Sequence, residues 1–532
     1  MTEIVPRTLN VVTTAAGSPS SPALIRYGEP AGRWTLVAMV LGSGLAFIDG
    51  TVVNIALPRI GEELGADAAG LQWTVNGYTL TLAAFILLGG SLGDRFGRRR
   101  VFMVGVAWFA LASLLCGVAP NVGTLVAARA LQGVGGALLT PGALAILQAS
   151  FVREDRMKAI GAWSGLGGIA GAVGPFLGGW LVEVASWRLV FLINLPLATL
   201  VLLVAAKHVP ESSDPEAARE LDLAGAGLGI VGLAGLTYGF TVWPERGGTD
   251  LVVLVSLAVG VLGLAGFVAV ERSARHPMLP MLLFRSTVFS ATNVVTFIIY
   301  AALGGVFFFV VVNLQVVSGF SPLAAGIALL PVTLLMLLLS ARAGALATRI
   351  GPRIPMTLGP IVCAGGLVLL ARVGTGASYV VDVLPAVVMF GLGLSLTVAP
   401  LTSTALAAAD DRYAGVASGV NNAVARAGGL LAVAILPLAA GLGASLTDAA
   451  ALAPAYRTSM LICATMLAVS GLLSFAAIPS SLAECRESAA ATAPEPAGQH
   501  EPEQSPVKMH CAVTGPPLHP QTAGEGAPGS TR

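Results

Sequence analysis

Long apolar runs, separated by short polar segments, fill most of this 532-residue chain. A run of about 20 apolar residues is long enough to cross the hydrocarbon core of a bilayer. Helix is the expected form, because a backbone exposed to lipid must satisfy its own hydrogen bonds. The pattern predicts fourteen spans, near 34–56, 70–92, 101–119, 122–147, 159–181, 187–206, 222–243, 250–271, 287–316, 322–347, 354–374, 378–403, 413–440 and 456–478.

The polar segments carry their basic residues unevenly when they are assigned alternately to the two sides of a membrane. One side holds only Arg59, Arg188, Arg246, Arg372 and Arg457, and the other side holds most of the rest. Lys and Arg beside membrane spans are retained in the cytoplasm. We therefore expect both termini to be cytoplasmic. Heavy use of Arg over Lys, with abundant Ala and Gly, indicates a bacterial source and hence a bacterial cell membrane.

A glycine- and arginine-rich turn occurs twice. The spacing Gly90-x-Leu-x-Asp94-Arg95-x-Gly97-x-Arg99 follows the second predicted span. It returns after the tenth span as Gly344-x-Leu-x-Thr348-Arg349-x-Gly351-x-Arg353, without the acidic residue. A repeat at this offset predicts two related halves, with a substrate site between them near the bilayer midplane.

Two halves of six spans leave two spans over, and the repeat places these between the sixth and ninth. We therefore predict five regions. These are a cytoplasmic N-terminal tail (1–33), a six-helix bundle (34–206), a linker with two extra, peripheral spans (207–271), a second six-helix bundle (272–478) and a disordered cytoplasmic tail (479–532) rich in Ala, Pro, Glu, Ser and Gly.

Composition excludes several functions. With 55% hydrophobic and 11% charged residues, the chain is a multi-pass membrane protein. It has no basic stripe for nucleic acid. Its five cysteines lack metal-ligand spacing, so we expect no metal site. There is no phosphate-binding Gly-x-x-x-x-Gly-Lys-Ser/Thr loop and no catalytic constellation, so we expect no enzyme activity and no cofactor.

Charged residues inside predicted spans are few, and each is a functional hypothesis because a charge in the membrane is costly. Asp49 lies well inside the first span, where desolvation favours a carboxyl group that takes up and releases protons. A structural hydrogen bond to Thr51 or to a neighbouring helix is the alternative. Arg129 lies in the fourth span on one helical face with Gln132, and must have a counter-ion or a polar cage. Structural pairing alone remains an alternative here too.

These features resemble the major facilitator superfamily and, within it, the 14-span drug:proton antiporters. The repeated turn is similar to the loop motif of the superfamily, which implies a conformational role for Gly90, Asp94, Arg95, Gly97 and Arg99. Asp49, Asn54 and Pro58 match a first-span motif. Arg129 matches a fourth-span arginine implicated in proton coupling. In the fifth span, the small residues and the Gly-Pro pair resemble a hinge motif of proton-driven exporters, carried here by Gly171, Gly174, Pro175, Gly178 and Gly179.

Further polar residues in the spans are candidates for a substrate cavity: Asn54, Tyr78, Gln132, Asn313, Gln315, Asn421, Asn422 and Arg426. Arg426 is similar to a recurring pattern of the 14-span family, but a snorkelling side chain is an equal interpretation. The resemblance implies an all-α facilitator fold with two six-helix bundles plus two extra helices, which are central in the order of the sequence.

The function that this implies is proton-coupled antiport, exporting a hydrophobic or amphipathic small molecule such as an antibiotic, drug or secondary metabolite. The expected partners are that small-molecule substrate, protons and membrane lipid, and the protein is expected to be a monomer. A lipid or other metabolite facilitator, and a transporter-like membrane sensor acting through its C-terminal tail, are the alternatives.

Overall fold

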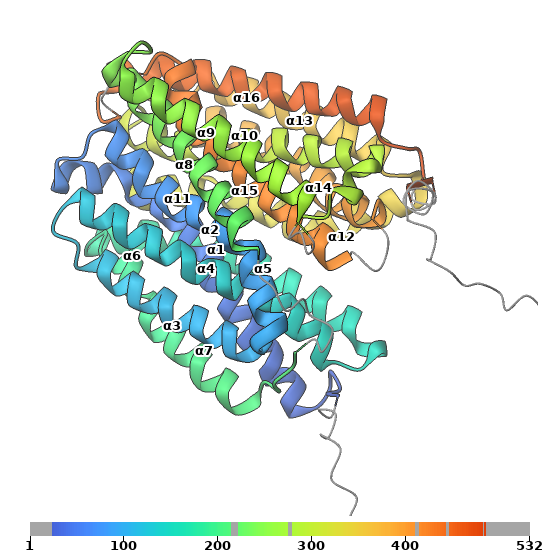
Figure 1. The fold of residues 1–532 in the computed structure, drawn as a ribbon. Helices are drawn as coiled ribbons and strands as arrows, with labels where there is room; N and C mark the ends of the chain where they lie inside the picture. The colour runs from blue at the N-terminus through green and yellow to red at the C-terminus, as the bar shows by residue number, and fades with distance from the viewer. Residues whose placement is uncertain are drawn as a thin grey trace, which may run out of the picture. The chain divides into compact units, whose positions relative to one another are not determined.

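The computed structural model describes residues 24–213, 222–274, 279–409, 414–442, 446–481 and 484–485. These belong to one compact unit, Met1–Thr492. In the described ranges all regular elements are helical, and extended pairing is confined to an isolated bridge between Ile25 and Phe151. The all-helical prediction is therefore confirmed for this part of the chain (Figure 1).

The helices follow one another in a simple order. They are α1 (Pro30–Leu64), α2 (Ala68–Phe96), α3 (Arg98–Gly117), α4 (Val122–Ser150), α5 (Arg153–Val184), α6 (Leu189–Leu192), α7 (Asn194–His208), α8 (Leu223–Arg246), α9 (Leu251–Ser273), the 3-10 helix η1 (Met281–Arg285), α10 (Thr287–Val316), α11 (Pro322–Ala328), α12 (Leu330–Ile350), α13 (Arg353–Leu370), the π-helix η2 (Tyr379–Val383), α14 (Leu384–Ala407), α15 (Ala414–Ala439) and α16 (Ala449–Ala477).

Many of these helices begin at a polar residue that caps the helix. The side chain accepts a hydrogen bond from a backbone N–H of the first turn, which has no partner within the helix. The residues that do so include Asp67, Asn121, Asp222, Asp250, Ser286, Ser321 and Asp448. The short polar segments of the sequence thus fix where the apolar helices start.

Thirteen helical stretches in the described residues are long and apolar enough to cross a membrane. The predicted fifth span, 159–181, falls on α5, a helix of 32 residues. The side chains of several residues in its first two-thirds lie outside the description. The count of fourteen spans therefore stays a prediction.

Three predicted spans are not single continuous helices. The span at 187–206 is divided into α6 and α7, the span at 322–347 into α11 and α12, and the span at 378–403 into η2 and α14. Pro196, Pro331 and Pro385 lie within the first three residues after these divisions. Because proline cannot donate to the preceding turn, the helical ladder is interrupted there. The apolar pattern alone does not show this interruption.

Most packing contacts join helices of the same half. In the first half, α4 packs against α2 and α3, and α1 packs against α5 and α7. In the second half, α10 packs against α15 and α16, and α13 packs against α14 and α16. Small residues permit close approach, as where Gly304 of α10 faces Gly429 of α15.

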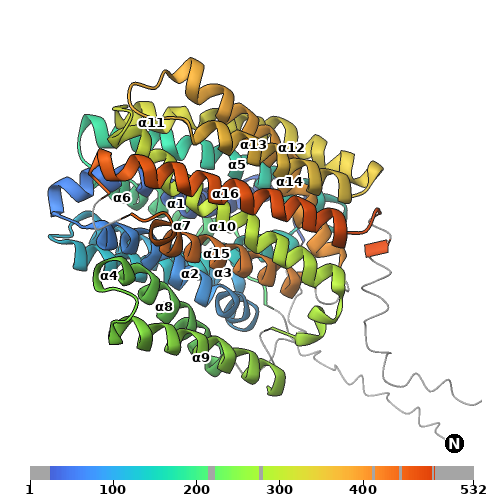
Figure 2. The same cartoon turned by 90° about the horizontal axis from the view of Figure 1, so that it is seen from above.

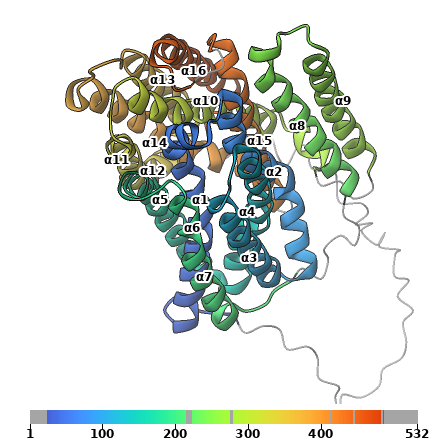
Figure 3. The same ribbon diagram turned by 90° about the vertical axis from the view of Figure 1, so that its left-hand side faces the viewer.

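Helices α8 and α9 correspond to the two extra predicted spans and pack chiefly on each other. Figure 2 and Figure 3 show them side by side at the edge of the other helices. Helix α8 contacts α2 of the first half and α15 of the second. The ring of Trp73 on α2 lies 6.1 Å from the ring of Tyr238 on α8.

The predicted tails are only partly described. Residues 1–23 of the N-terminal tail and nearly all of the tail at 479–532 lie outside the described residues. Residues 24–29 precede α1, and the Ile25 N–H donates to the Ser150 carbonyl at 2.8 Å. Cys485 is buried against a small cluster that includes Leu283 and Phe289.

Candidate functional site

Asp49 of α1 and Arg129 of α4 form a fully buried ion pair. An Nη1 atom of Arg129 lies 2.5 Å from Oδ2 of Asp49, and the two side chains are 1% and 0% exposed. Helices α1 and α4 pack against each other, which brings together two residues 80 positions apart. A buried charge is tolerated only with a partner and further hydrogen bonds. The structure thus gives each of these predicted residues the counter-charge that it requires.

Amide side chains complete the surroundings of the carboxylate. Gln132 Nε2 donates to Asp49 Oδ1 at 2.8 Å, and Asn194 Nδ2 of α7 lies 3.3 Å from the same oxygen. Both amides also donate to the Ser113 hydroxyl of α3 at 2.9 Å. That hydroxyl donates to the Phe191 carbonyl at 3.1 Å. Helices α1, α3, α4 and α7 therefore meet in one hydrogen-bonded network.

Arg129 has partners besides Asp49. It donates from Nε to the Thr74 carbonyl at 3.0 Å and from Nη1 to Gln132 Oε1 at 2.6 Å. Its guanidinium carbon lies 4.3 Å from the centre of the Tyr78 ring and 5.7 Å from that of Phe191. Aromatic faces attract a cation, and more strongly where water is excluded. This cage stabilises the positive charge of Arg129 in addition to Asp49.

Two members of this network, Ser113 and Asn194, are absent from the sequence predictions. Both are fully buried. Each is a polar residue inside an apolar run, in Leu111-Ala112-Ser113-Leu114 and Leu192-Ile193-Asn194-Leu195. An uncharged polar residue in a span was therefore the available signal. It is a weak one, because Ser and Asn in spans often bond only to their own helix.

The glycine-rich part of α5 lies directly against the Asp49 segment of α1. A Cβ atom on Gly174 would meet Thr51 Oγ1 at 2.5 Å, and one on Gly178 would meet Val52 at 2.7 Å. On another face, a Cβ on Gly179 would lie 2.7 Å from the backbone of Leu323 in α11. The Pro175 carbonyl faces Gly326 of the same helix. Gly171 lies in α5, and its surroundings are outside the described part.

These contacts place the predicted hinge residues between the ion pair and the second half. Helix α5 packs on α1 through one row of small residues and on α11 and α12 through another. Larger side chains at the described positions would separate the helices. The close approach of α5 to α1 and to α11 therefore depends on glycine at these positions.

The first copy of the loop motif forms the turn between α2 and α3. Gly97 alone separates the two helices, with a φ of 106° that favours glycine. Gly90 lies in α2, and Asp94 accepts from Arg98 Nε at 2.8 Å. The partner of Asp94 is thus Arg98, which stands at an unspecified position of the repeated spacing, rather than Arg95 or Arg99. The Arg95 guanidinium carbon lies 4.9 Å from the centre of the Phe96 ring.

The predicted cavity residues of the second half do not join the Asp49 network. Asn313 donates to the Val373 carbonyl at 3.2 Å. Asn421 of α15 donates to Thr296 and Asn293 of α10 at 2.8 and 3.2 Å. Asn422 is half-buried on α15. These contacts lie within the second half.

Of three other predicted residues, Gln315 and Arg426 lie on helices of the second half that contact the first half. Gln315 of α10 donates to the Ile55 carbonyl of α1 at 3.1 Å. Arg426 is half-buried on α15, a helix that packs against α2 of the first half and α10 of the second. Asn54 is buried on α1, and its Oδ1 atom has no hydrogen-bond partner among the described residues.

A polar contact joins the halves at the C-terminal end of α5. Glu183 Oε2 accepts from the Ser321 hydroxyl at 2.7 Å and from the Leu323 N–H at 3.1 Å. Nearby, Glu63 accepts from Trp187 Nε1 at 2.6 Å and pairs with Arg188. Trp187 is 2% exposed. It is therefore packed within the protein.

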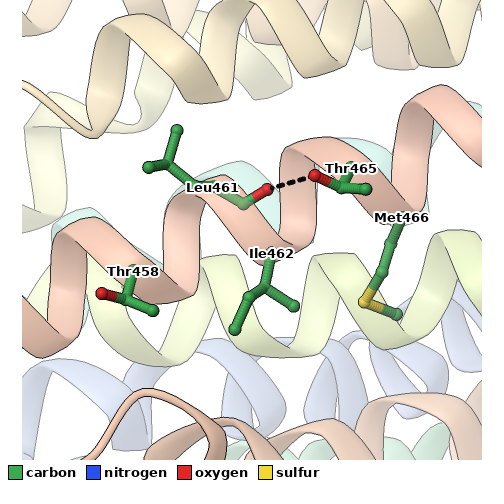
Figure 4. Close-up of a pocket in the computed structure, with 5 residues that line it drawn as sticks. All are labelled: Thr458, Leu461, Ile462, Thr465 and Met466. Carbon is green, nitrogen blue, oxygen red and sulfur yellow. Dashed lines mark hydrogen bonds between the residues drawn. The ribbon is translucent and has the colours of Figure 1, made fainter.

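A shallow pocket of about 360 Å³ lies along α16, away from these residues (Figure 4). Its lining is Thr458, Leu461, Ile462, Thr465 and Met466. The Thr465 hydroxyl donates to the carbonyl of Leu461 in its own helix at 2.9 Å. No predicted cavity residue lines it, and both of its threonine hydroxyls donate to carbonyls of their own helix.

Long apolar helices around a buried ion pair define a multi-pass membrane protein with a charged centre inside its first half. Comparison with known proteins then identifies the family. Residues 39–433 match the model of the Major Facilitator Superfamily, and the chain belongs to this family of transporters. It is a transporter and not an enzyme.

Relatives with established names resemble most of the chain. It is 38% identical over 425 residues to the puromycin resistance protein pur8 of Streptomyces alboniger, covering 79% of this chain and 84% of that protein. It is 36% identical over 415 residues to the multidrug resistance protein Stp of Mycobacterium tuberculosis, covering 77% of each. The tetracenomycin C resistance and export protein of Streptomyces glaucescens is 36% identical over 426 residues, covering 79% of this chain and 78% of that protein.

Solved structures show the same fold at low sequence identity. A bacterial homologue of the human lysosomal transporter Spinster, in an inward-facing and occupied conformation, has a TM-score of 0.59 at 16% identity. It covers 86% of this chain and 98% of that one. The peptide transporter POT in complex with sulfate has a TM-score of 0.62 at 15% identity, covering 85% and 98%. The facilitator fold predicted from the sequence is thus confirmed.

Proposed function

We propose that this protein exports a hydrophobic or amphipathic small molecule, such as an antibiotic or other secondary metabolite, in exchange for protons. The names of the three relatives, two resistance proteins and one resistance and export protein, support export of such compounds. Residues 34–206 and 272–478 act as two six-helix bundles that expose the substrate site alternately to each side. Both termini lie in the cytoplasm, as the distribution of basic residues indicates.

The buried pair of Asp49 and Arg129 is the observation that supports proton coupling. With Asp49 ionised, the two charges cancel and the carboxylate is held by Arg129, Gln132 and Asn194. When Asp49 takes up a proton, Arg129 keeps its bonds to the Thr74 carbonyl and to Gln132 Oε1, and its contact with the Tyr78 ring. Those partners stabilise Arg129 while Asp49 is protonated. The uptake of one proton by Asp49 then leaves the buried pair with a net positive charge.

Helix α5 provides a route from this charge to the interface between the halves. Gly174 and Gly178 contact α1 within three residues of Asp49, and Gly179 contacts α11. A change of position of α1 is therefore transmitted to the contact of Glu183 with Ser321 and Leu323. On the predicted topology this contact is at the outer surface. In this conformation, hydrogen bonds therefore join the outer ends of α5 and α11.

The test is energised efflux from a bacterium that lacks its own pumps. The full chain is expressed, and the export of a panel of planar aromatic antibiotics and dyes is measured with and without a protonophore. We expect efflux that the protonophore abolishes. Efflux that persists without a proton gradient would contradict proton coupling. Absence of efflux of every compound, with the protein present in the membrane, would count against drug export.

A further inference from the structure

Both copies of the loop motif contact the end of the last helix of their own half. Arg99 Nη1 donates to the Val209 carbonyl at 3.0 Å, and Arg353 Nε donates to the Ile478 carbonyl at 2.7 Å. The two arginines occupy the same position of the repeated spacing. Val209 directly follows α7, and Ile478 directly follows α16. Each arginine thus places a positive charge on a free carbonyl at a helix C-terminus, where it is stabilising.

In the first copy, several positive charges lie at a helix N-terminus without an acidic residue beside them in the sequence, whereas the second copy has only one such charge. Helix α3 begins with Arg98, Arg99 and Arg100, has no acidic residue in its first turn, and receives no side-chain cap from Gly97. Cations at a helix N-terminus are unfavourable, because this end already carries a partial positive charge. Helix α13 begins Arg353-Ile354-Pro355, with one arginine only.

Glu211 supplies the missing negative charge from a distant part of the chain. Its Oε1 atom accepts from the Arg99 N–H at 3.0 Å. Its Oε2 atom lies 3.7 and 3.6 Å from Nε of Arg99 and Arg100. The Arg98 N–H donates to the Ser212 carbonyl at 2.8 Å. Residues 209–212 therefore cap the start of α3 as an N-cap residue would.

Gly97 makes room for this carboxylate. A Cβ atom built on Gly97 would lie 2.7 Å from Glu211 Oε1. In the second copy, a backbone carbonyl, that of Ser480, occupies the matching place against Gly351. The motif glycine thus has a second requirement besides its positive φ. It leaves space for an acceptor that arrives from the end of the same half.

We propose that Glu211 is a clasp that holds the α2–α3 turn, the start of α3 and the end of α7 together as one body. The clasp goes beyond the proposed function, because it concerns how the first half keeps its shape while transport proceeds. It assigns a partner to the arginines of the loop motif, and it gives Glu211 a positioning role. Glu211 touches no part of the Asp49 network.

Limited trypsin cleavage of the purified full-length protein tests the clasp. Trypsin cuts after arginine, so cleavage at residues 98–100 reports opening of the first turn of α3. We expect Glu211→Gln to raise the cleavage rate about fivefold, the effect of removing a negative charge that stabilises a helix N-terminus. Glu154→Gln is the matched control, an exposed carboxylate in the first turn of α5. Equal cleavage of Glu211→Gln and the control would overturn the proposal.

A second measurement addresses Gly97. If the glycine makes room for Glu211, Gly97→Ala accelerates cleavage more in the wild-type background than in Glu211→Ala, where the carboxylate is gone. Equal acceleration in both backgrounds would reduce the role of Gly97 to its φ angle and contradict this part of the proposal. Both cleavage assays test the role of Glu211 independently of transport, so they are informative even if no exported compound is found.

For a compound that is exported, Glu211→Gln should lower the maximal efflux rate and leave KM unchanged at an equal amount of protein in the membrane. This is the expected result for a residue that positions moving parts and does not touch substrate. An unchanged maximal rate, together with faster cleavage, would contradict the positioning role.

Discussion

Replacing Asp49 by asparagine is the sharpest test of the buried centre. The Asp49 carboxylate faces only donors: Nη1 of Arg129, Nε2 of Gln132 and Nδ2 of Asn194. Asparagine has nearly the same shape, but one of its two terminal atoms is an NH₂ group. Whichever way the amide is turned, an N–H faces another N–H. The substitution therefore removes the counter-charge of Arg129 and also breaks at least one hydrogen bond.

The expected cost follows from the burial. Removing one partner of a buried ion pair costs about 3–5 kcal/mol, because the other charge is left uncompensated. Arg129 keeps the Thr74 carbonyl, Gln132 Oε1 and the Tyr78 ring. A desolvated cation–π contact is worth about 2 kcal/mol. These partners already exist in the wild type, but they can tighten. We expect a loss near the lower limit, about 3 kcal/mol.

The assay is a double-mutant cycle on the free energy of unfolding in detergent, with Asp49→Asn, Arg129→Gln and the double variant. Because the double variant has no uncompensated charge, it should be more stable than either single variant. Its coupling energy should be about 2 kcal/mol or more, as for groups in one network. Proton-driven efflux should be lost in all three variants, with insertion intact. Additive single effects, or normal efflux by a well-expressed Asp49→Asn variant, would refute the reasoning.

Three further outcomes are expected. Glu183→Gln should weaken the joined ends of α5 and α11, so that thiol labelling of a cysteine introduced at the buried Ala325 of α11 becomes faster. Glu62→Gln, on an exposed carboxylate outside this contact, should leave that labelling rate unchanged. Tyr78→Phe should preserve stability, because the ring beneath Arg129 remains; Tyr78→Leu should lose about 2 kcal/mol in the same unfolding assay. Truncation after Cys485 should keep efflux near the full-length rate, because the buried Cys485 is retained; loss of efflux would favour a sensor acting through the tail.

Sequence reasoning found the charged residues of the centre for a physical reason. A charge in an apolar span is costly, so Asp49 and Arg129 each stand out in the sequence, and Arg129 in particular requires a counter-ion or a polar cage. That the two residues pair with each other is seen only in the structure. Ser113 and Asn194 complete the same network, but a neutral polar residue in a span has many inexpensive alternatives. Their role depends on the packing of α3 and α7, which no local pattern contains.

The loop motif illustrates the same limit. Its repetition indicates two related halves, and its arginines indicate a cytoplasmic turn. The partner of Asp94 is nevertheless Arg98, and the partner of Arg99 and Arg100 is Glu211, more than 100 positions away. A glutamate in the segment after α7 has no distinguishing pattern. Only the folded chain shows that the space beside Gly97 belongs to that carboxylate.

The hydrogen bonds between the halves give the proposed proton coupling a physical path from Asp49 to the interface. They include those that link Ile55 to Gln315, and Glu183 to Ser321 and Leu323. Ile55 lies six residues after Asp49 on α1, and Glu183 ends the helix whose glycines pack against that stretch of α1. Both links therefore depend on the position of the helix that carries Asp49. In the proposed cycle, a shift of α1 on protonation of Asp49 would strain both links together, because the glycines of α5 hold that helix in direct contact with α1.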